Sequence, residues 1–229
     1  MRKVKIHSLD VTFQRRFSSG LSLNAAFSAN RAVDWATILN EYDKAPTQWL
    51  TSDNSKPYRV TASGVYQLPF GKGRAFLKKG ILSAIAGGWQ ASSTFEWQPG
   101  PLLTWGNLFF YGKLDDIRSA STLDRWFNID AGFERDPAKV PTGFQKRVFP
   151  TVIDGVRRDK LLLLNGNLSR TIPLRERVHF ELRVDAANAL NRSHFGAPNG
   201  DPTSTQFGVV SQTSGTICRW YTFIGKITF

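Results

Sequence analysis

The chain has 229 residues, 41% of them hydrophobic, and no run of 18 or more apolar residues, so it has no segment that could form a transmembrane helix. A single cysteine, Cys218, excludes a disulfide framework and a cysteine-based zinc site. The formal net charge of +12 suggests nucleic acid, but the excess lies in short basic clusters without a recognition motif, and we expect no nucleic-acid partner.

Alternation of apolar and polar side chains with period two predicts seven β-strands. Each is close to the ~9–11 residues that a tilted strand needs to cross a membrane, whereas strands of soluble proteins more often have about 5–6. In chain order the predicted strands are residues 8–17, 21–30, 58–70, 88–98, 162–172, 178–186 and 221–229.

The sixth predicted strand shows the alternation most clearly. Its apolar face would meet lipid and its polar face the lumen of a barrel. The polar side chains could be read as a metal or acid–base cluster, but charges of both signs at alternate positions pair across strands, and we interpret them as a lumen network. The apolar face holds Val178, Phe180, Leu182, Val184 and Ala186, and the polar face holds His179, Glu181, Arg183 and Asp185.

The connections between these strands alternate in length. Short connections lie at 18–20 and 173–177, a medium one at 71–87, and long ones at 31–57, 99–161 and 188–219. Outer-membrane barrels alternate short periplasmic turns with long extracellular loops in this way. The predicted fold is therefore all-β: an antiparallel, up-and-down transmembrane β-barrel segment of about seven strands in sequence order, which alone would form an open, curved sheet with apolar residues exposed on its convex side. Whether 99–161 hides a further hairpin, for instance at 102–111, stays open.

Two features of the sequence, the connection 71–87 and a set of paired aromatic residues, each allow two structural interpretations. The connection 71–87 mixes cations with apolar residues, which suits either a short amphipathic element at the inner leaflet or a helical turn packed under the barrel. Trp89 and Trp97 share a face eight residues apart, and Tyr58 and Tyr66 repeat that spacing. These pairs fit two interfacial aromatic girdles or a core stripe of the same period.

No residues are predicted to be catalytic, to bind a cofactor or to bind a metal, so we expect no enzyme. The remaining histidines, His7 and His194, belong to no recognisable triad, and no Gly-x-Ser-x-Gly elbow is present. Cys218, beside the last strand, is interpreted as a packing residue.

Six stretches form a recognisable combination: Val65-Tyr-Gln-Leu-Pro-Phe-Gly-Lys-Gly-Arg74, Gly87-Gly-Trp-Gln90, Gln98-Pro-Gly-Pro-Leu-Leu-Thr104, Asp185-Ala-Ala-Asn-Ala-Leu-Asn191, His194-Phe-Gly196 and Phe207-Gly208. Together they resemble the late barrel of Oar-like TonB-dependent outer-membrane receptors. The resemblance runs from about Tyr58 to Phe229, and it implies a transporter that recognises its substrate through extracellular loops. It also implies outer-membrane localisation and a terminal Phe229 that the barrel-assembly machinery reads.

The resemblance sets an expectation for the domain organisation. Such receptors have roughly 22 strands, an amino-terminal plug and a segment that contacts TonB, and this sequence contains none of the plug or TonB segment. Residues 1–10 lack the apolar stretch of a signal peptide. We therefore expect residues 1–229 to form the carboxy-terminal part of a receptor barrel. Its partners would be outer-membrane lipid, the remaining strands and plug, and TonB only through the upstream segment. The alternative is another outer-membrane barrel, such as a pore, an adhesin-like protein or a hydrolase.

Overall fold

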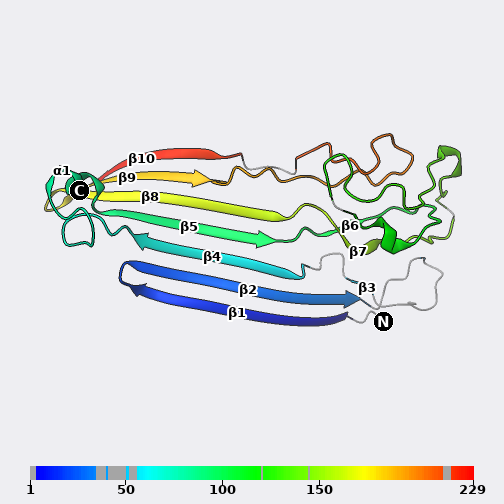
Figure 1. The fold of residues 1–229 in the computed structure, drawn as a ribbon, viewed down its shortest axis with the longest axis horizontal. Helices are drawn as coiled ribbons and strands as arrows, with labels where there is room; N and C mark the ends of the chain where they lie inside the picture. The colour runs from blue at the N-terminus through cyan, green and yellow to red at the C-terminus, as the bar shows by residue number, and fades with distance from the viewer. Residues whose placement is uncertain are drawn as a thin grey trace.

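The computed structural model describes residues 4–34, 40, 50–51, 56–119, 121–143, 145–213 and 218–229. Over these residues one large antiparallel sheet dominates the molecule (Figure 1), and no helix is long and apolar enough to cross a membrane. The long strands of this sheet are β1 (Val4–Ser18), β2 (Leu21–Asp34), β4 (Tyr58–Gln67), β5 (Trp89–Gln98), β8 (Leu161–Arg175), β9 (Val178–Ala187) and β10 (Trp220–Thr228).

The long strands form one meander in chain order, as the sequence predicts. Each pairs antiparallel with the long strand before it, and β8 pairs with β9 through a register that runs from Gly166↔Ala186 to Arg175↔Val178. The short β3 (Leu50–Thr51) pairs back on β2. Strands β1 and β10 are the two edges of the sheet in Figure 1, so the sheet is open within the described residues.

The further hairpin that the sequence left open near 102–111 does not join this sheet. Strand β5 pairs directly with β8, from Trp89↔Arg170 to Gln98↔Leu161. Strand β6 (Leu102–Thr104) instead pairs with β7 (Val152–Arg157) in a separate two-stranded sheet. Both lie within the long connection, and no described residue of 99–160 adds a strand to the large sheet.

Strand ends differ from the predicted ranges for local reasons. Strand β4 ends at Gln67 rather than at Phe70, because Pro69 has no N–H to donate to the ladder. Strand β8 continues past Ile172 to Arg175, with a register shift between Pro173 and Arg175. Strand β1 starts at Val4, four residues before the predicted start.

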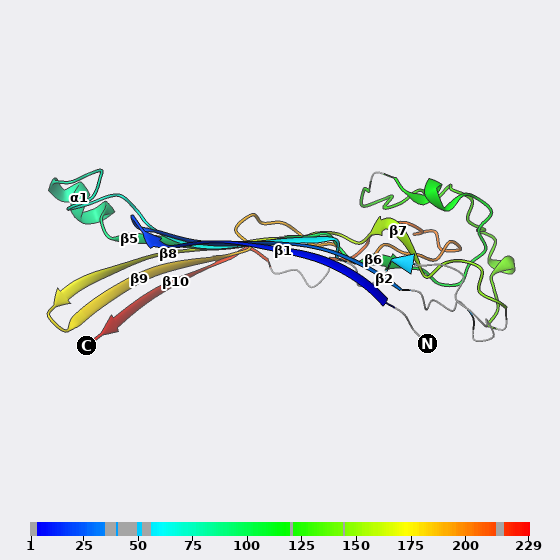
Figure 2. The ribbon, with the colours of Figure 1, turned by 90° about the horizontal axis from the view of Figure 1, so that it is seen from below.

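The register sorts side chains onto two faces, as the alternation predicts. One row across the sheet pairs Phe13 with Ala25, Ala62, Phe95 and Leu164, all on the predicted lipid face. A row of the opposite face pairs Ser22 with Val65, Ser92, Asn167 and Asp185, followed by Thr222. Residues of this second face line a concavity of about 440 Å³. The polar face is therefore concave and the apolar face convex, with the curvature visible in the edge-on view (Figure 2).

The aromatic pairs lie on the convex face near its two ends. Tyr58 and Trp97 stack with ring centroids 5.0 Å apart, and Trp89 lies at the other end of the same strand β5. Tyr58 and Tyr66 are each 39% exposed. Because these rings lie on an exposed face, they do not form a core stripe, and their placement agrees with the predicted interfacial girdles.

The sheet separates short turns from long loops. The β1–β2 turn, the β8–β9 turn and the carboxy terminus lie at one end, and the long connections lie at the other (Figure 1). The connection 68–88 lies at the short-turn end and contains helix α1 (Gly80–Ala86). The two ends of this connection meet at Gly71 and Gly87. A Cβ at Gly71 would meet the Cα of Gly87 at 2.6 Å, so only glycine fits at this position.

Candidate functional site

The buried core of the protein lies in the long loops rather than in the sheet. We call the described residues of 99–160 and 188–213 the loop assembly; it contains β6, β7 and the 3₁₀ turns η1 (Leu114–Ile117) and η2 (Pro137–Lys139). Every buried hydrophobic residue of the described chain belongs to it. The core cluster consists of Leu103, Trp105, Leu108, Ile117, Trp126, Phe127, Phe133, Phe149, Ile153, Val156, Phe207 and Val210.

Aromatic rings make the centre of this core. Trp105 lies 4.8 Å from the ring centroid of Phe127 and 5.7 Å from those of both Phe133 and Phe149. Phe207, from the segment after β9, packs edge-on against Phe127 at 5.2 Å. Edge-to-face aromatic pairs add about 0.5–1.5 kcal/mol each beyond area burial. The two long loops therefore share one core and form one packed body.

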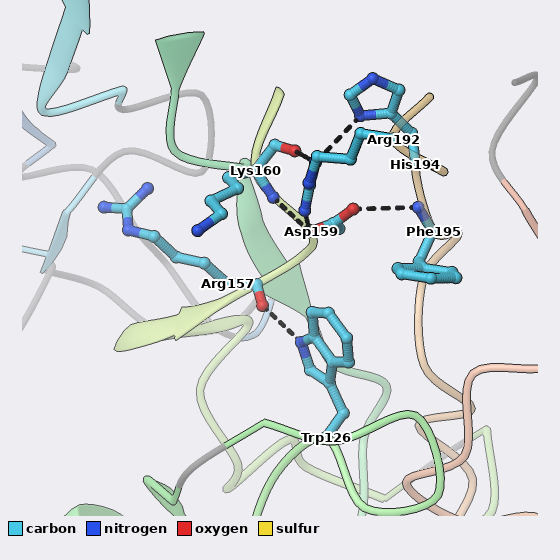
Figure 3. Close-up of polar contacts among 7 residues, drawn as sticks. All are labelled: Trp126, Arg157, Asp159, Lys160, Arg192, His194 and Phe195. Carbon is cyan, nitrogen blue, oxygen red and sulfur yellow. Dashed lines mark hydrogen bonds and ion pairs between the residues drawn. The ribbon is translucent and has the colours of Figure 1, made fainter. Parts of the chain in front are cut away.

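An ion pair joins the two loops where they leave the sheet (Figure 3). Asp159, just before β8, accepts from the Arg192 guanidinium at 2.6 Å and from the Phe195 backbone N–H at 3.0 Å. Arg192 also donates to the Lys160 carbonyl at 2.6 Å and lies 3.3 Å from Nδ1 of His194. The Asp159 and Arg192 side chains are only 8% and 21% exposed. Removing one partner of such a shielded pair leaves the other charge uncompensated, which costs more than breaking an exposed pair.

Asn188 presents Arg192 to this ion pair. It follows β9, is 1% exposed and adopts a positive φ of 45°. Its side chain donates to the Arg192 carbonyl at 3.0 Å and accepts the Arg192 backbone N–H at 3.2 Å. Asparagine tolerates this left-handed conformation and bonds the nearby backbone. The Asn of the Asp185–Asn191 motif therefore closes the turn that positions Arg192.

Two further polar anchors fix the loop assembly. The Trp126 indole N–H donates to the Arg157 carbonyl at 2.7 Å (Figure 3). Arg147 donates to the carbonyls of Phe149 at 2.8 Å and Trp105 at 2.6 Å, and burial lowers the pKa of its guanidinium. Each of these bonds pairs a buried or partly buried side-chain donor with a backbone carbonyl of the loop assembly.

A groove of about 490 Å³ lies where β7 approaches the loop-side ends of β1 and β2. Its ionisable lining residues are His7, Arg31, Asp154 and Arg157. Arg157 donates to the Gly100 carbonyl at 3.1 Å, and its guanidinium pKa is lowered by burial. The groove is open and mostly apolar in its lining, and it lies on the convex side, because His7 and Arg31 share a face with the Leu9–Ala29 pair.

The sixth-strand polar residues lie on the concave face, where the sequence places them. Arg183 pairs with Asp185 at 2.8 Å, Asn167 donates to Asp185, and the register sets Lys226 opposite Glu181. On the same face Arg59 pairs with Glu96 at 2.8 Å. These pairs agree with a compensating network on the lumen side, and the described residues contain no group of three or more His, Cys, Asp or Glu that could hold a metal ion.

Some expectations were wrong or fall outside the described residues. Cys218 is exposed just before β10, so it does not pack as expected. Most of the predicted loop 31–57 lies outside the described residues. The shared aromatic core and the Asp159–Arg192 pair were missed, because loop residues show no periodicity; the density of Trp and Phe within 99–161 was the one available signal.

A comparison with models of protein families agrees with this architecture. A family model described as outer membrane beta barrel domain matches residues 2–221. Among solved structures, the outer membrane transporter YddB from Escherichia coli is similar at 13% identity and a TM-score of 0.41, over 99% of this chain and 25% of that chain. The chain thus spans about a quarter of that transporter's length. No curated protein matches the chain. The convex apolar wall, the concave polar face and the family match together establish that this chain belongs to the outer membrane beta barrel domain family, and hence to the outer membrane.

Proposed function

We propose that the chain forms part of the barrel wall and the substrate-recognition loops of a TonB-dependent outer-membrane receptor, and that it has no enzymatic activity. The observation that carries the proposal is the packed loop assembly seated at one end of an open, polar-lined sheet. A recognition surface needs loops held in one geometry by a rigid scaffold. The Asp159–Arg192 pair and the shared aromatic core supply that rigidity.

The open sheet supports a wide parent barrel. Amides on the outer edges of β1 and β10 have no strand partner within the described residues, and hydrocarbon would leave them unsatisfied. An eight-stranded barrel could close, but its narrow interior is filled by side chains. Here the concave face carries small polar residues such as Ser22, Ser63 and Ser92 around an open concavity. That surface suits a broad lumen that is wet or filled by a plug.

The proposed partners follow from this placement. Outer-membrane lipid would cover the convex face, and the remaining strands would pair with β1 and β10. Phe229, 94% exposed after β10, would be read by the barrel-assembly machinery. A plug would fill the lumen, and TonB would act through a segment upstream of the plug.

Sequencing the DNA upstream of this reading frame tests the proposal. We expect codons for further strands, preceded by a plug and a TonB-contacting segment. A secretion signal joined directly to this barrel, with no plug, would contradict the proposal and favour a pore, an adhesin-like barrel or a hydrolase. A second test deletes tonB in the native host and measures energy-dependent uptake of substrate through the receptor. Uptake that persists in the deletion strain would also contradict the proposal.

A further inference from the structure

Helix α1 lies on the lipid side of the wall, not inside the barrel. The indole N–H of Trp89 donates to the Ile85 carbonyl at 3.0 Å. The Arg170 guanidinium donates to the same carbonyl at 2.6 Å and also to the Ala84 carbonyl. Trp89 and Arg170 are cross-strand partners on the convex apolar face. Figure 2 shows α1 rising from the convex side of the sheet, opposite the side toward which β10 curves.

The contact with Arg170 also explains how so short a helix is held. Its last carbonyls have no intrahelical partner, and a cation at the carboxy end of a helix satisfies them and favours the helix dipole. The helix has no side-chain cap at its other end. Trp89 and Arg170 therefore tie α1 to the row of the sheet that holds the aromatic girdle at the short-turn end.

The outer surface of this segment is apolar and uncovered by the described residues. No residue of α1 is buried. Ile81, Leu82 and Ile85 are 78%, 63% and 61% exposed, and Phe76 just before the helix is 59% exposed. Exposed aliphatic side chains this dense are unfavourable in water. The membrane interface is where such a helix buries its apolar face.

Charge beside the apolar surface selects the kind of lipid. Lys78 and Lys79 directly precede α1 and are exposed. Lys72 is exposed in the same connection, whereas Arg74 is bound to Gln67 at 2.8 Å. Short turns of an outer-membrane barrel face the periplasm, so these ammonium groups lie at the headgroups of the inner leaflet. Anionic headgroups attract such lysines by about 1 kcal/mol each.

We propose that residues 72–86 form an interfacial anchor that inserts Ile81, Leu82 and Ile85 into the inner leaflet and binds anionic phospholipid headgroups through Lys78 and Lys79. The anchor fixes the depth of the barrel in the membrane from outside the wall. This proposal rests on the outer-membrane assignment and does not depend on the TonB-dependent receptor proposal.

Spin labelling of the assembled barrel, purified from the outer membrane and placed in lipid nanodiscs, tests insertion. In a Cys218→Ser background, a nitroxide at Leu82→Cys should collide with oxygen and be shielded from a water-soluble nickel reagent. A label at Asp115→Cys, which is 84% exposed in the loop assembly, should behave oppositely. Ile81→Cys repeats the measurement should Leu82→Cys fold poorly. A label at 82 as accessible to nickel as that at 115, or shielded from both reagents by protein, would overturn the proposal.

Headgroup selectivity has its own readout. Enrichment of phosphatidylglycerol over phosphatidylcholine around the barrel should fall roughly thirtyfold in Lys78→Gln/Lys79→Gln, which removes about 1 kcal/mol of attraction at each lysine. The matched variant Lys113→Gln/Lys160→Gln removes two exposed cations from the loop assembly and should leave enrichment unchanged. Equal enrichment in the Lys78/Lys79 variant and the parent would overturn headgroup binding, and equal loss in both variants would show a nonspecific charge effect and overturn it too.

Discussion

The wall and the loop assembly bury apolar surface by opposite means. In the loop assembly, Phe127 and Ile117 are 1% and 0% exposed among other side chains of the chain. In the wall, Phe13 and Phe223 are 57% and 78% exposed, although they are equally apolar. The loop assembly buries its apolar residues in a core of its own and exposes polar residues to water. The wall instead exposes its apolar residues to the acyl chains of the lipid. One chain is therefore adapted to two solvents, and the boundary lies where β5, β8 and β9 leave the membrane.

This contrast predicts which substitutions damage each region. Truncating a packed core residue leaves a cavity. Truncating a lipid-facing wall residue leaves space that mobile acyl chains fill. A charge is tolerated on the concave face and costly on the convex face. The following predictions use the assembled barrel, and each is measured against a matched variant.

The largest effect is expected at the centre of the loop core. Phe127→Ala should destabilise the loop assembly by about 3–5 kcal/mol, because the cavity lies among Trp105, Phe133 and Phe207. Urea unfolding followed by tryptophan fluorescence in detergent micelles measures this change. Phe13→Ala on the convex face should leave the loop transition unchanged. A similar loss in both variants would mean that the loops have no independent core.

A charge on the convex face between the two aromatic girdles should come next. Leu168→Arg should cost about 2 kcal/mol in a refolding titration into lipid vesicles, since Leu168 lies inside the girdle of Trp89 but short of the midplane. Its neighbour Asn167 lies on the concave face, and Asn167→Arg should cost much less. Equal costs at the two positions would contradict the assigned faces.

Breaking the ion pair between the loops should cost less than emptying the core. Asp159→Ala leaves Arg192 and the Phe195 N–H without their acceptor, which should cost about 1–3 kcal/mol. A double-mutant cycle with Arg192→Ala measures the coupling. The exposed pair Arg125–Asp130 is the control, and Asp130→Ala should change stability by less than about 1 kcal/mol. A coupling energy between Asp159 and Arg192 no larger than that between Arg125 and Asp130 would show that burial does not strengthen the Asp159–Arg192 pair.

The smallest effect is a pH dependence at Glu134 in the loop assembly. Hydrogen bonds from the backbone N–H of Asp136 and then the charge of Lys139 and the N–H of Arg135 lower the pKa of its carboxyl below 4.5, against the opposing effect of burial. The folded state therefore favours the carboxylate, and this stabilisation is present above the unfolded pKa and lost as pH falls through the folded one. The melting temperature of the loop assembly should fall more steeply below pH 4.5 than in Glu134→Gln. Parallel profiles would rule this contribution out.

The sequence predicted the wall well because its physics is periodic. Lipid on one side and an aqueous lumen on the other force alternation at every step, so the order, pairing and faces of the long strands could all be read from the chain. The sixth strand, with Phe180 and His179 on opposite faces, was predicted within one residue of the observed β9. Strand ends were missed where local chemistry intervenes, as at Pro69.

The loop assembly could not be predicted in the same way. Its core joins residues as distant as Trp105 and Phe207, and no period relates them. The motifs that carry the resemblance nevertheless include residues that fix the loop assembly. Asn188 closes the turn before Arg192, and Phe207 fills the core. A Cβ at Gly100 would meet the Arg158 carbonyl oxygen at 2.3 Å, so this close approach requires glycine. The residues that carry the resemblance therefore hold the loops on the wall, while the surface that would contact a substrate has no motif.

The most direct test of the central claim compares two adjacent residues of β8 in the membrane. In a Cys218→Ser background, a fluorophore is attached at Leu164→Cys or at Asn165→Cys, and the assembled barrel is placed in vesicles whose acyl chains carry a nitroxide quencher. Leu164 lies on the convex face, and Asn165 on the concave polar face. We predict strong quenching at position 164 and little at 165. Equal quenching at both positions, or stronger quenching at 165, would contradict the assignment of this sheet as a barrel wall with a lipid-facing convex side.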